Sequence, residues 1–244
     1  MPLPRFHAPD LDAAHRVARL PPDEAHHLTR VLRLGVGDEV AVFDGRGHEY
    51  RAKVTVAARD VVALELHDPI VPAPEARVPL TLVQAILKGD KMDEVVRDAT
   101  MMGVTAIEPV ITARTIARHM GRDTERWARV AVASAKQCRR ATVPSIAAPR
   151  PFDAWLATQA HGLPLLLVEP SAASGEENSM RLLESHAAGS IALIVGPEGG
   201  WTDEERTRAL AGACVPVTLG ALTLRADAIP IAALAVVRFA LRDF

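Results

Sequence analysis

The stretch IALIVGPEGGWTDEE, residues 191–205, decides most of what the sequence says about the fold. Its first five residues are an apolar run typical of a buried parallel strand. Three glycines and a proline follow within residues 196–200. Thr202 and Glu205 then have the spacing of a capping box, which predicts that a helix begins there. The stretch is therefore a strand, a tight turn and a helix in succession, as in an α/β domain.

The glycine-rich turn in this stretch also suggests a ligand site. Glycines let a ligand approach the backbone closely, and open α/β folds bind ligands at the carboxyl ends of their strands. The three acidic residues at 203–205 disfavour a phosphate at the helix start, and neither the P-loop nor the dinucleotide fingerprint is present. A nucleoside without a phosphate fits better than ATP or NAD. An ordinary strand-to-helix turn is the alternative, and spacing alone slightly favours it.

Similar patterns continue outward from this stretch. Apolar runs at 80–87, 104–111, 163–168 and 215–219 predict further parallel strands. Helices are expected at 90–102 and 124–140, and a last one near Pro230. Residues 73–244 thus form a predicted α/β domain.

Prolines at 69, 72, 74 and 79 mark a break in the chain, so we place a domain boundary between residues 72 and 73. Before it, residues 48–56 alternate between apolar and polar, and a turn at 44–47 joins them to the run 39–43. A further strand is expected at 61–66. Residues 1–72 are therefore predicted to form a small antiparallel barrel or sheet.

Composition restricts the class of protein. The chain has 244 residues, of which 49% are hydrophobic and 24% charged, so it can bury a sizeable core. No apolar stretch long enough to span a membrane and no secretory signal are visible, and we expect a cytoplasmic protein without membrane contact. Cys138 and Cys214 lack ligand spacing, which predicts no disulfide and no metal site.

The net charge is −2, yet it is unevenly distributed. Residues 114–150 carry nine basic side chains and only two acidic ones. On charge alone, contact with RNA phosphates and an ordinary solvated helix face are about equally plausible. A second feature is the segment LGALTLRADA, residues 219–228, where Arg225 and Asp227 precede an apolar helix. The two residues either have a functional role, form a salt bridge or cap the helix.

The order of the motifs resembles the SPOUT class of S-adenosylmethionine-dependent RNA methyltransferases, and within it the RsmE family of 16S rRNA (uracil-N3)-methyltransferases. The resemblance rests on PRF at 4–6, HHLTRVLR at 26–33, FDGRG at 43–47, KGDKMD at 88–93, QCRRATVP at 137–144, GPEGG at 196–200 and LGALTLR at 219–225. It implies a PUA-like RNA-binding β-barrel at 1–72 and a SPOUT α/β domain with a deep trefoil knot at 73–244. It also implies a homodimer, to which the apolar final helix could contribute.

The resemblance further implies methyl transfer from S-adenosylmethionine to N3 of a specific uridine in the 16S rRNA of the small ribosomal subunit, without a metal. Arg225, Asp227 and Arg5 are the implied catalytic residues. Asp227 or Glu198 is the candidate proton acceptor, and His26 and His27 are alternatives. The implied cofactor-binding residues are Val168, Gly196, Pro197, Glu198, Gly199, Gly200, Leu219, Gly220, Leu222, Leu224 and Arg225. The implied RNA-binding residues are Arg5, His26, Arg30, Arg33, Lys88, Lys91, Arg114, Arg139 and Arg140.

The chain departs from the family pattern at a few positions. The family usually has an acidic residue at Met101 or Met102 and another at Lys136, and its usual Glu-Thr pair appears here as Asp227-Ala228. These changes motivate an alternative, a PUA-like RNA-binding protein whose knotted domain is catalytically inactive. The missing phosphate-binding fingerprints weigh against a third hypothesis, an unrelated α/β nucleotide-binding enzyme.

Overall fold

A computed structural model describes residues 3–58, 61–116, 123–158, 162–170 and 189–243. The chain forms two compact units. The first contains Met1–Glu75 and Val132–Val143, and the second contains Ala76–Ala131 and Pro144–Phe244. The segment Val132–Val143, which sequence analysis assigns to the second domain, therefore belongs to the first unit.

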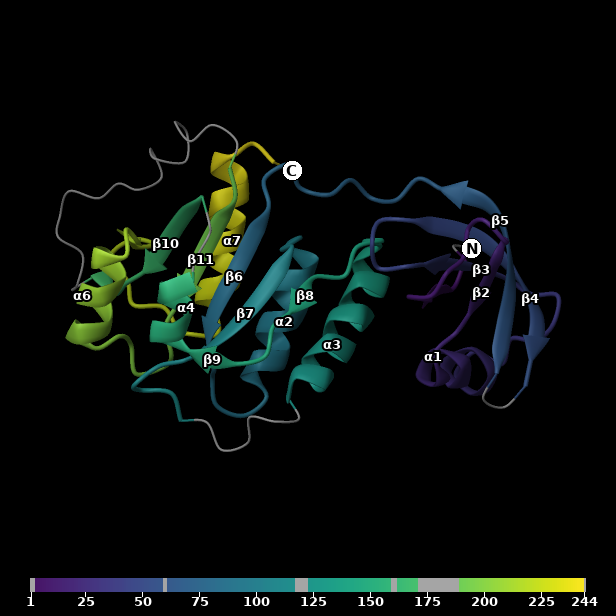
Figure 1. Cartoon of the computed structure of the whole chain (residues 1–244), viewed down its shortest axis with the longest axis horizontal. Helices are drawn as coiled ribbons and strands as arrows, with labels where there is room; N and C mark the ends of the chain where they lie inside the picture. The colour runs from purple at the N-terminus through teal and green to yellow at the C-terminus, as the bar shows by residue number, and fades with distance from the viewer. Residues whose placement is uncertain (1–2, 59–60, 117–122, 159–161, 171–188, 244) are drawn as a thin grey trace. The chain divides into compact units, whose positions relative to one another are not determined.

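The first unit is built on a five-stranded sheet with the order β1-β3-β4-β5-β2 (Figure 1). Its strands are β1 (Arg5–His7), β2 (Val17–Arg19), β3 (Glu39–Phe43), β4 (Glu49–Ala57) and β5 (Val62–Ile70). The hairpin of β3 and β4 and the following strand β5 are confirmed. The sheet is mixed rather than purely antiparallel, because β1 pairs with β3 in parallel. That pairing could not be read from a three-residue strand.

Two further elements complete the first unit. Helix α1 (Pro22–His26) continues directly into a π-helical turn, η1 (His27–Val31), and Leu28 from this turn is fully buried in the core of the sheet. The last part of helix α3 (Asp123–Cys138) also belongs to this unit. After it, Thr142 forms bridges to Gly45 and Arg46 at the hairpin turn.

The second unit contains a parallel sheet with the order β12-β10-β11-β6-β7-β8, and β9 pairs with β7. These strands are β6 (Leu80–Ala85), β7 (Ala106–Ile111), β8 (Ser145–Ile146), β9 (Arg150–Pro151), β10 (Leu163–Leu167), β11 (Ile191–Val195) and β12 (Val215–Val217). All five strands that the apolar runs predict are present and parallel. Strands β6, β10 and β11 are buried along their whole length, as expected for a sheet covered on both faces.

Helices cover the two faces of the parallel sheet (Figure 1). Those of the second unit are α2 (Lys91–Met101), the first part of α3, α4 (Phe152–Thr158), α6 (Asp203–Ala211) and α7 (Ile229–Ala240). Side chains of α4 and α6 pack in one core cluster with β6, β10 and β11, while α7 contacts α2 and β11. The trefoil knot stays a prediction.

The strand order also shows where a ligand would bind. The chain places β7 on one side of β6, and later places β10 and β11 on the other side. Such a reversal of direction opens a crevice at the carboxyl ends of the strands. In this unit, the glycine-rich turn at 196–200 follows β11 at that edge.

Candidate functional site

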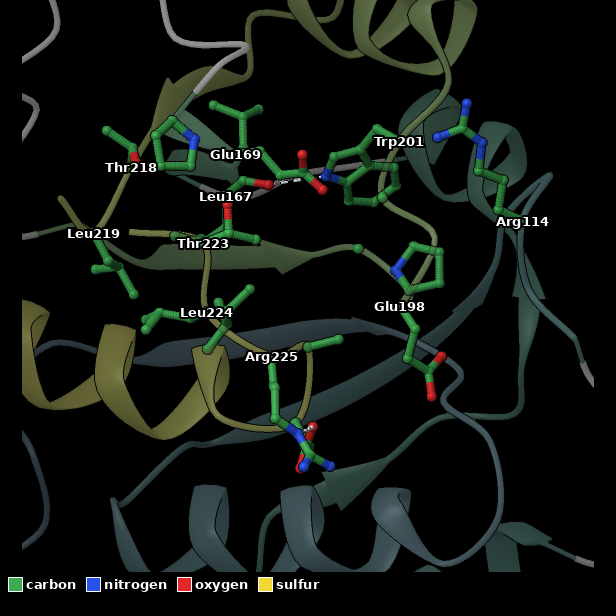
Figure 2. Close-up of a pocket in the computed structure, with 18 of the residues that line it drawn as sticks. Arg114, Leu167, Glu169, Glu198, Trp201, Thr218, Leu219, Thr223, Leu224 and Arg225 are labelled. Carbon is green, nitrogen blue, oxygen red and sulfur yellow. Dashed lines mark hydrogen bonds and ion pairs between the residues drawn. The ribbon is translucent and has the colours of Figure 1, made fainter. Parts of the chain in front are cut away.

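A pocket of ≈ 470 Å³ lies at the carboxyl ends of β10 and β11 (Figure 2). Its walls come mainly from three loops, at 167–170, 196–201 and 218–227, and all its lining residues belong to the second unit. The volume is in the range of small-molecule sites, which are mostly apolar with a few well-placed polar groups. Here the apolar side chains include Leu219, Leu224 and Trp201.

The glycine turn is closely packed, so a side chain at Gly196 or Gly199 would displace its neighbours. A Cβ on Gly196 would lie 3.0 Å from Cε2 of Trp201, and one on Gly199 would lie 3.3 Å from Cβ of Arg114. The indole of Trp201 is itself held in place, because its Nε1–H donates to the Leu167 carbonyl at 2.9 Å and its ring packs on Phe152 at a centroid distance of 4.7 Å. The turn therefore has a rigid wall behind it.

The helix that follows the turn begins as predicted. The Thr202 hydroxyl accepts from the Glu205 N–H at 3.2 Å, and the Glu205 carboxylate accepts from the Thr202 N–H at 3.0 Å, so the capping box is confirmed. The same buried carboxylate also accepts from the Ala113 N–H at 2.8 Å. Glu205 thus joins the glycine turn to the loop after β7, a link that no spacing rule predicts.

Glu198 points from the glycine turn toward the start of α2. Its carboxylate accepts from the Lys91 Nζ at 3.0 Å and from the Lys88 N–H at 3.1 Å. Burial by itself would raise the pKa of Glu198, but the hydrogen bonds from Lys91, from its own backbone N–H and from the Lys88 N–H outweigh burial and lower the pKa. Glu198 is therefore ionised at neutral pH and already accepts these three hydrogen bonds.

Arg225 and Asp227 come together on the opposite loop. Arg225 Nε donates to Asp227 Oδ1 at 3.2 Å, and the arginine side chain is 75% exposed. Burial alone would raise the pKa of Asp227, but hydrogen bonds from its own N–H and from Arg225, with the charges of Arg225 and Lys91, lower it. Ala228 is the N-cap of α7 and makes no side-chain cap hydrogen bond, so the pair forms a salt bridge and not a helix cap.

Most of the implied cofactor residues meet in this pocket. Nine of the eleven line it, and Gly199 and Gly220 do not. Asp227 also lines it, as do Lys91 and Arg114, which the resemblance assigns to RNA. Sequence reasoning missed Leu167, Glu169, Pro170, Trp201, Arg206, Thr218, Thr223, Ala226 and Ile229. Most of these residues lie within a few positions of the motifs that carry the resemblance. Extending each motif by those positions would have included them.

The position of Arg5 differs from what the implied catalytic and RNA-binding roles require. Its side chain is 11% exposed, forms two hydrogen bonds to the Glu49 carboxylate at 2.8 and 2.9 Å, and donates to the backbone carbonyls of residues 135, 136 and 140. These carbonyls lie at and just beyond the end of α3, where helices leave acceptors without partners. Arg5 therefore holds the end of α3 against the sheet of the first unit.

Some of the other implied RNA-binding residues are exposed, and others form ion pairs within the protein. Arg140 is buried, and its Nη2 lies 2.6 Å from a Glu75 carboxylate oxygen. The side chains that remain exposed are His26, Arg30, Arg33, Lys88, Arg114 and Arg139. Lys136, where the family usually has an acid, donates to Glu24 at 2.7 and 2.9 Å, so its reversed charge is neutralised locally.

Across the residues that the structure describes, no cluster of three or more His, Cys, Asp or Glu side chains could hold a metal ion. In the same residues, no helix has both the length and the apolar character that crossing a membrane requires.

Comparison with known proteins decides the family. A model of the RNA methyltransferase domain matches residues 74–238, and one of the RNA methyltransferase PUA domain matches residues 20–66. Over 212 residues the chain is 35% identical to ribosomal RNA small subunit methyltransferase E of Synechocystis, covering 87% of this chain and 69% of the relative. The chain belongs to the ribosomal RNA small subunit methyltransferase E family.

Solved structures of similar proteins have the same fold. A methyltransferase E from Neisseria gonorrhoeae, solved with bound S-adenosyl methionine, is 30% identical and superposes with a TM-score of 0.85, covering 97% of each chain. A putative methyltransferase from Legionella pneumophila, in complex with the same cofactor, is 25% identical with a TM-score of 0.86 over 98% of each chain. Family membership thus confirms the predicted combination of a PUA domain and an RNA methyltransferase domain.

Proposed function

We propose that this protein transfers the methyl group of S-adenosylmethionine to N3 of a uridine in the rRNA of the small ribosomal subunit. The observation that carries the proposal is the pocket at the carboxyl ends of β10 and β11, formed around the glycine turn. The Neisseria relative, 30% identical and alike over almost the whole chain, was solved with this cofactor. The Synechocystis relative is named for action on small-subunit rRNA.

The pocket fits the cofactor chemically. Gly196, Pro197 and Gly200 of the glycine turn line the pocket, so a ligand bound there would lie against the backbone of the turn. Leu219, Leu222 and Leu224 offer an apolar wall for an adenine ring, and the loops at 196–200 and 218–227 supply backbone donors and acceptors. The cofactor supplies an electrophilic methyl group on a sulfonium. We propose the implied cofactor residues above as its binding site, with Trp201 and Leu167 as additional contacts.

The protein must also help the uridine lose its N3 proton, because protonated N3 is a poor nucleophile. Glu198 accepts hydrogen bonds from the Lys91 side chain, the Lys88 N–H and its own N–H, whereas Asp227 accepts only from the Arg225 side chain and its own N–H among the described residues. Asp227 is therefore the better proton acceptor of the two. Arg225, beside it and largely exposed, is placed to stabilise negative charge that develops on the uracil oxygens.

RNA recognition is proposed for the exposed basic side chains of the first unit, His26, Arg30, Arg33 and Arg139. Arg5 and Arg140 then act on RNA binding through the structure of that unit rather than by direct contact. A homodimer is proposed through α7, since Phe239 is 75% exposed, and through Leu222, which is 79% exposed. We propose the cytoplasm as the site of action.

The alternative of an RNA-binding protein without catalysis is not favoured. The pocket retains the glycine turn and a carboxylate at Asp227. The departure at Ala228 leaves the start of α7 intact, and the one at Lys136 is balanced by Glu24.

Two measurements test the proposal. Calorimetric titration with S-adenosylmethionine should show binding by the purified protein. Mass spectrometry of rRNA from a deletion strain should show one N3-methyluridine missing from the small-subunit rRNA, and the purified protein with cofactor should restore it. A protein that binds no cofactor, or a strain whose small-subunit rRNA keeps all its methylated uridines, would contradict the proposed function.

A further inference from the structure

Four cationic side chains line the pocket, and three of them are paired with carboxylates. The ion pairs join Lys91 Nζ to Glu198 Oε1 at 3.0 Å, Arg206 Nη2 to Asp203 Oδ1 at 3.3 Å, and Arg225 Nε to Asp227 Oδ1 at 3.2 Å. The fourth, Arg114, forms no ion pair with any residue that the structure describes. An unpaired charge beside paired ones, at the mouth of one pocket, requires an explanation.

Arg114 holds the glycine turn with part of its guanidinium. Its Nη1 donates to the Gly199 carbonyl at 2.7 Å, and its stem lies against Gly199, where a Cβ would approach the Arg114 Cβ and Cδ to 3.3 Å. This single hydrogen bond engages one of the five N–H donors of a guanidinium, leaving the others available. The carbonyl neutralises no charge.

The backbone that carries Arg114 is well held. The Ala113 N–H donates to the buried Glu205 carboxylate at 2.8 Å. On the other side, the Thr112 N–H donates to the Thr115 hydroxyl at 3.0 Å, and the Thr115 N–H donates to the Thr112 carbonyl at 3.1 Å. Arg114 is therefore an exposed side chain on a fixed base. Figure 2 shows it on the Trp201 side of the pocket, across from Leu219.

The positive charge of Arg114 helps to lower the pKa of the neighbouring Glu204, but the two side chains form no ion pair. The pKa of Glu204 is lowered first by hydrogen bonds from its own backbone N–H and from Thr202, and only then by the charges of Arg208 and Arg114. No ion pair forms between Glu204 and Arg114. The guanidinium thus remains available for an anion from outside the protein.

We propose that Arg114 binds an anionic oxygen of the target nucleotide while it holds the glycine turn through Gly199. The proposal rests on the proposed function and adds a specific contact to it. A planar guanidinium fork suits either source of such an oxygen. One is the phosphodiester of the target nucleotide, and the other is a uracil oxygen that gains negative charge as N3 loses its proton.

Two variants separate the charge from the structural hydrogen bond. Arg114→Gln removes the charge and keeps an N–H donor, while Arg114→Lys keeps both a charge and a donor. We expect Arg114→Gln to bind S-adenosylmethionine within about threefold of the unaltered protein and to lose about 10- to 100-fold in kcat/KM for rRNA methylation, the loss expected for one charge-assisted hydrogen bond. Arg114→Lys should recover part of that loss. The matched control is Arg208→Gln on α6, which removes a cation that pairs with Asp153 outside the pocket and should leave kcat/KM unchanged.

The kinetic parameters then identify the source of the oxygen. For a phosphodiester, the KM for RNA rises, and the log–log salt slope of RNA binding falls by about 0.7–0.9. For a uracil oxygen, kcat falls at unchanged KM, and the loss shrinks as the pH is raised and N3 deprotonates.

Two results would overturn the proposal. One is an Arg114→Gln protein with kcat/KM within threefold of the unaltered protein. The other is a loss of activity that matches a loss of cofactor affinity and disappears at saturating S-adenosylmethionine, which would leave Arg114 only its hydrogen bond to Gly199. Both are distinct from failure of the proposed function, in which the unaltered protein itself would neither bind cofactor nor methylate RNA.

Discussion

In the first unit, Arg5, Lys136 and Arg140 form ion pairs with Glu49, Glu24 and Glu75, and each of these cations is at most 15% exposed. In the pocket of the second unit, the cations lie nearer to solvent, with Lys91 31% and Arg225 75% exposed. The first group joins the end of α3 and the residues after it to the sheet, to α1 and to the segment at Glu75. The second group lines the pocket.

A basic segment in the sequence can therefore contain both buried, paired cations and exposed ones. Burying a charge is costly unless it is paired and hydrogen-bonded, so a cation that folds inward must have a partner. Of the nine basic residues at 114–150, Lys136 and Arg140 pair in the first unit, and Arg126 and Arg150 pair with Asp90 and Glu108 in the second. Arg118 and Arg122 lie outside the described residues. A count of charges therefore overstates the RNA contacts that this segment can make.

Among the substitutions considered, replacing Arg5 in the first unit should cost the most stability. Arg5→Ala leaves the Glu49 carboxylate, which is 6% exposed, without its Arg5 partner, and also removes the hydrogen bonds that Arg5 donates to three backbone carbonyls. We expect a loss of about 3–5 kcal/mol of unfolding free energy, the usual cost of breaking a buried pair. Chemical denaturation measures it.

Two controls define the result for Arg5. Arg51→Ala, at an exposed position on β4 of the same sheet, should change the free energy of unfolding by less than about 0.5 kcal/mol. At low denaturant, S-adenosylmethionine affinity should be the same in all three proteins, because the pocket is in the second unit. If Arg5→Ala kept full stability and lost only methyl transfer, the guanidinium would contact the RNA after all.

The next effect concerns the pocket. In Gly196→Val, the new side chain would meet the Trp201 ring, which the Leu167 carbonyl and Phe152 hold in place, so the glycine turn has to move. We expect S-adenosylmethionine affinity to fall at least about 100-fold, equivalent to about 2.7 kcal/mol. Calorimetry measures it, and circular dichroism checks the fold.

The matched control for this substitution is Gly35→Val in the first unit, where a Cβ meets nothing within 4 Å. Its cofactor affinity should be unchanged. A folded Gly196→Val protein that binds the cofactor normally would remove the glycine turn from the binding site.

The two regions also differ in how much the sequence predicts. The parallel strands, the capping box at Thr202 and Glu205 and most of the pocket lining follow from patterns that are local along the chain. They are predictable because the periodicity of a strand and the spacing of a helix cap each involve only a few consecutive residues.

The rest depends on contacts between residues far apart in sequence. The pairing of Thr142 with the turn at Gly45 and the hydrogen bonds of Arg5 to the end of α3 join segments about 100 or more residues apart, and no periodicity records them. The same holds for Glu205 and Ala113 in the second unit, 92 positions apart. Such contacts decide which charges are exposed, and so they decide which implied RNA contacts the structure supports.

A smaller effect distinguishes two adjacent arginines in the first unit. Arg139 is exposed, whereas Arg140 is buried against Glu75. Arg139→Ala should lower the log–log salt slope of RNA binding by about 0.7–0.9 while stability is kept. Arg140→Ala should lower the melting temperature and leave the slope of the folded protein unchanged. Equal slopes for Arg139→Ala and the unaltered protein would assign Arg139 to an ordinary solvated surface.

The smallest expected effect is that of pH on cofactor binding. The pKa values of Glu198 and Asp227 lie below their ordinary values of 4.5 and 3.8, because the hydrogen bonds from Lys91 and Arg225 outweigh burial. A carboxylate with a lowered pKa is charged at neutral pH, and its ion pair is lost only as the pH falls through that lowered value. S-adenosylmethionine affinity should therefore stay constant between about pH 8 and pH 5, and decline only below about pH 4.

Methyl transfer should behave differently over the same range and rise with pH, because N3 of the uridine must lose its proton before it attacks. Isothermal titration and initial rates at matched ionic strength measure the two. Cofactor binding with a midpoint between about pH 5 and pH 7 would show that a group other than these two carboxylates controls the pocket, since neither can titrate there with a lowered pKa.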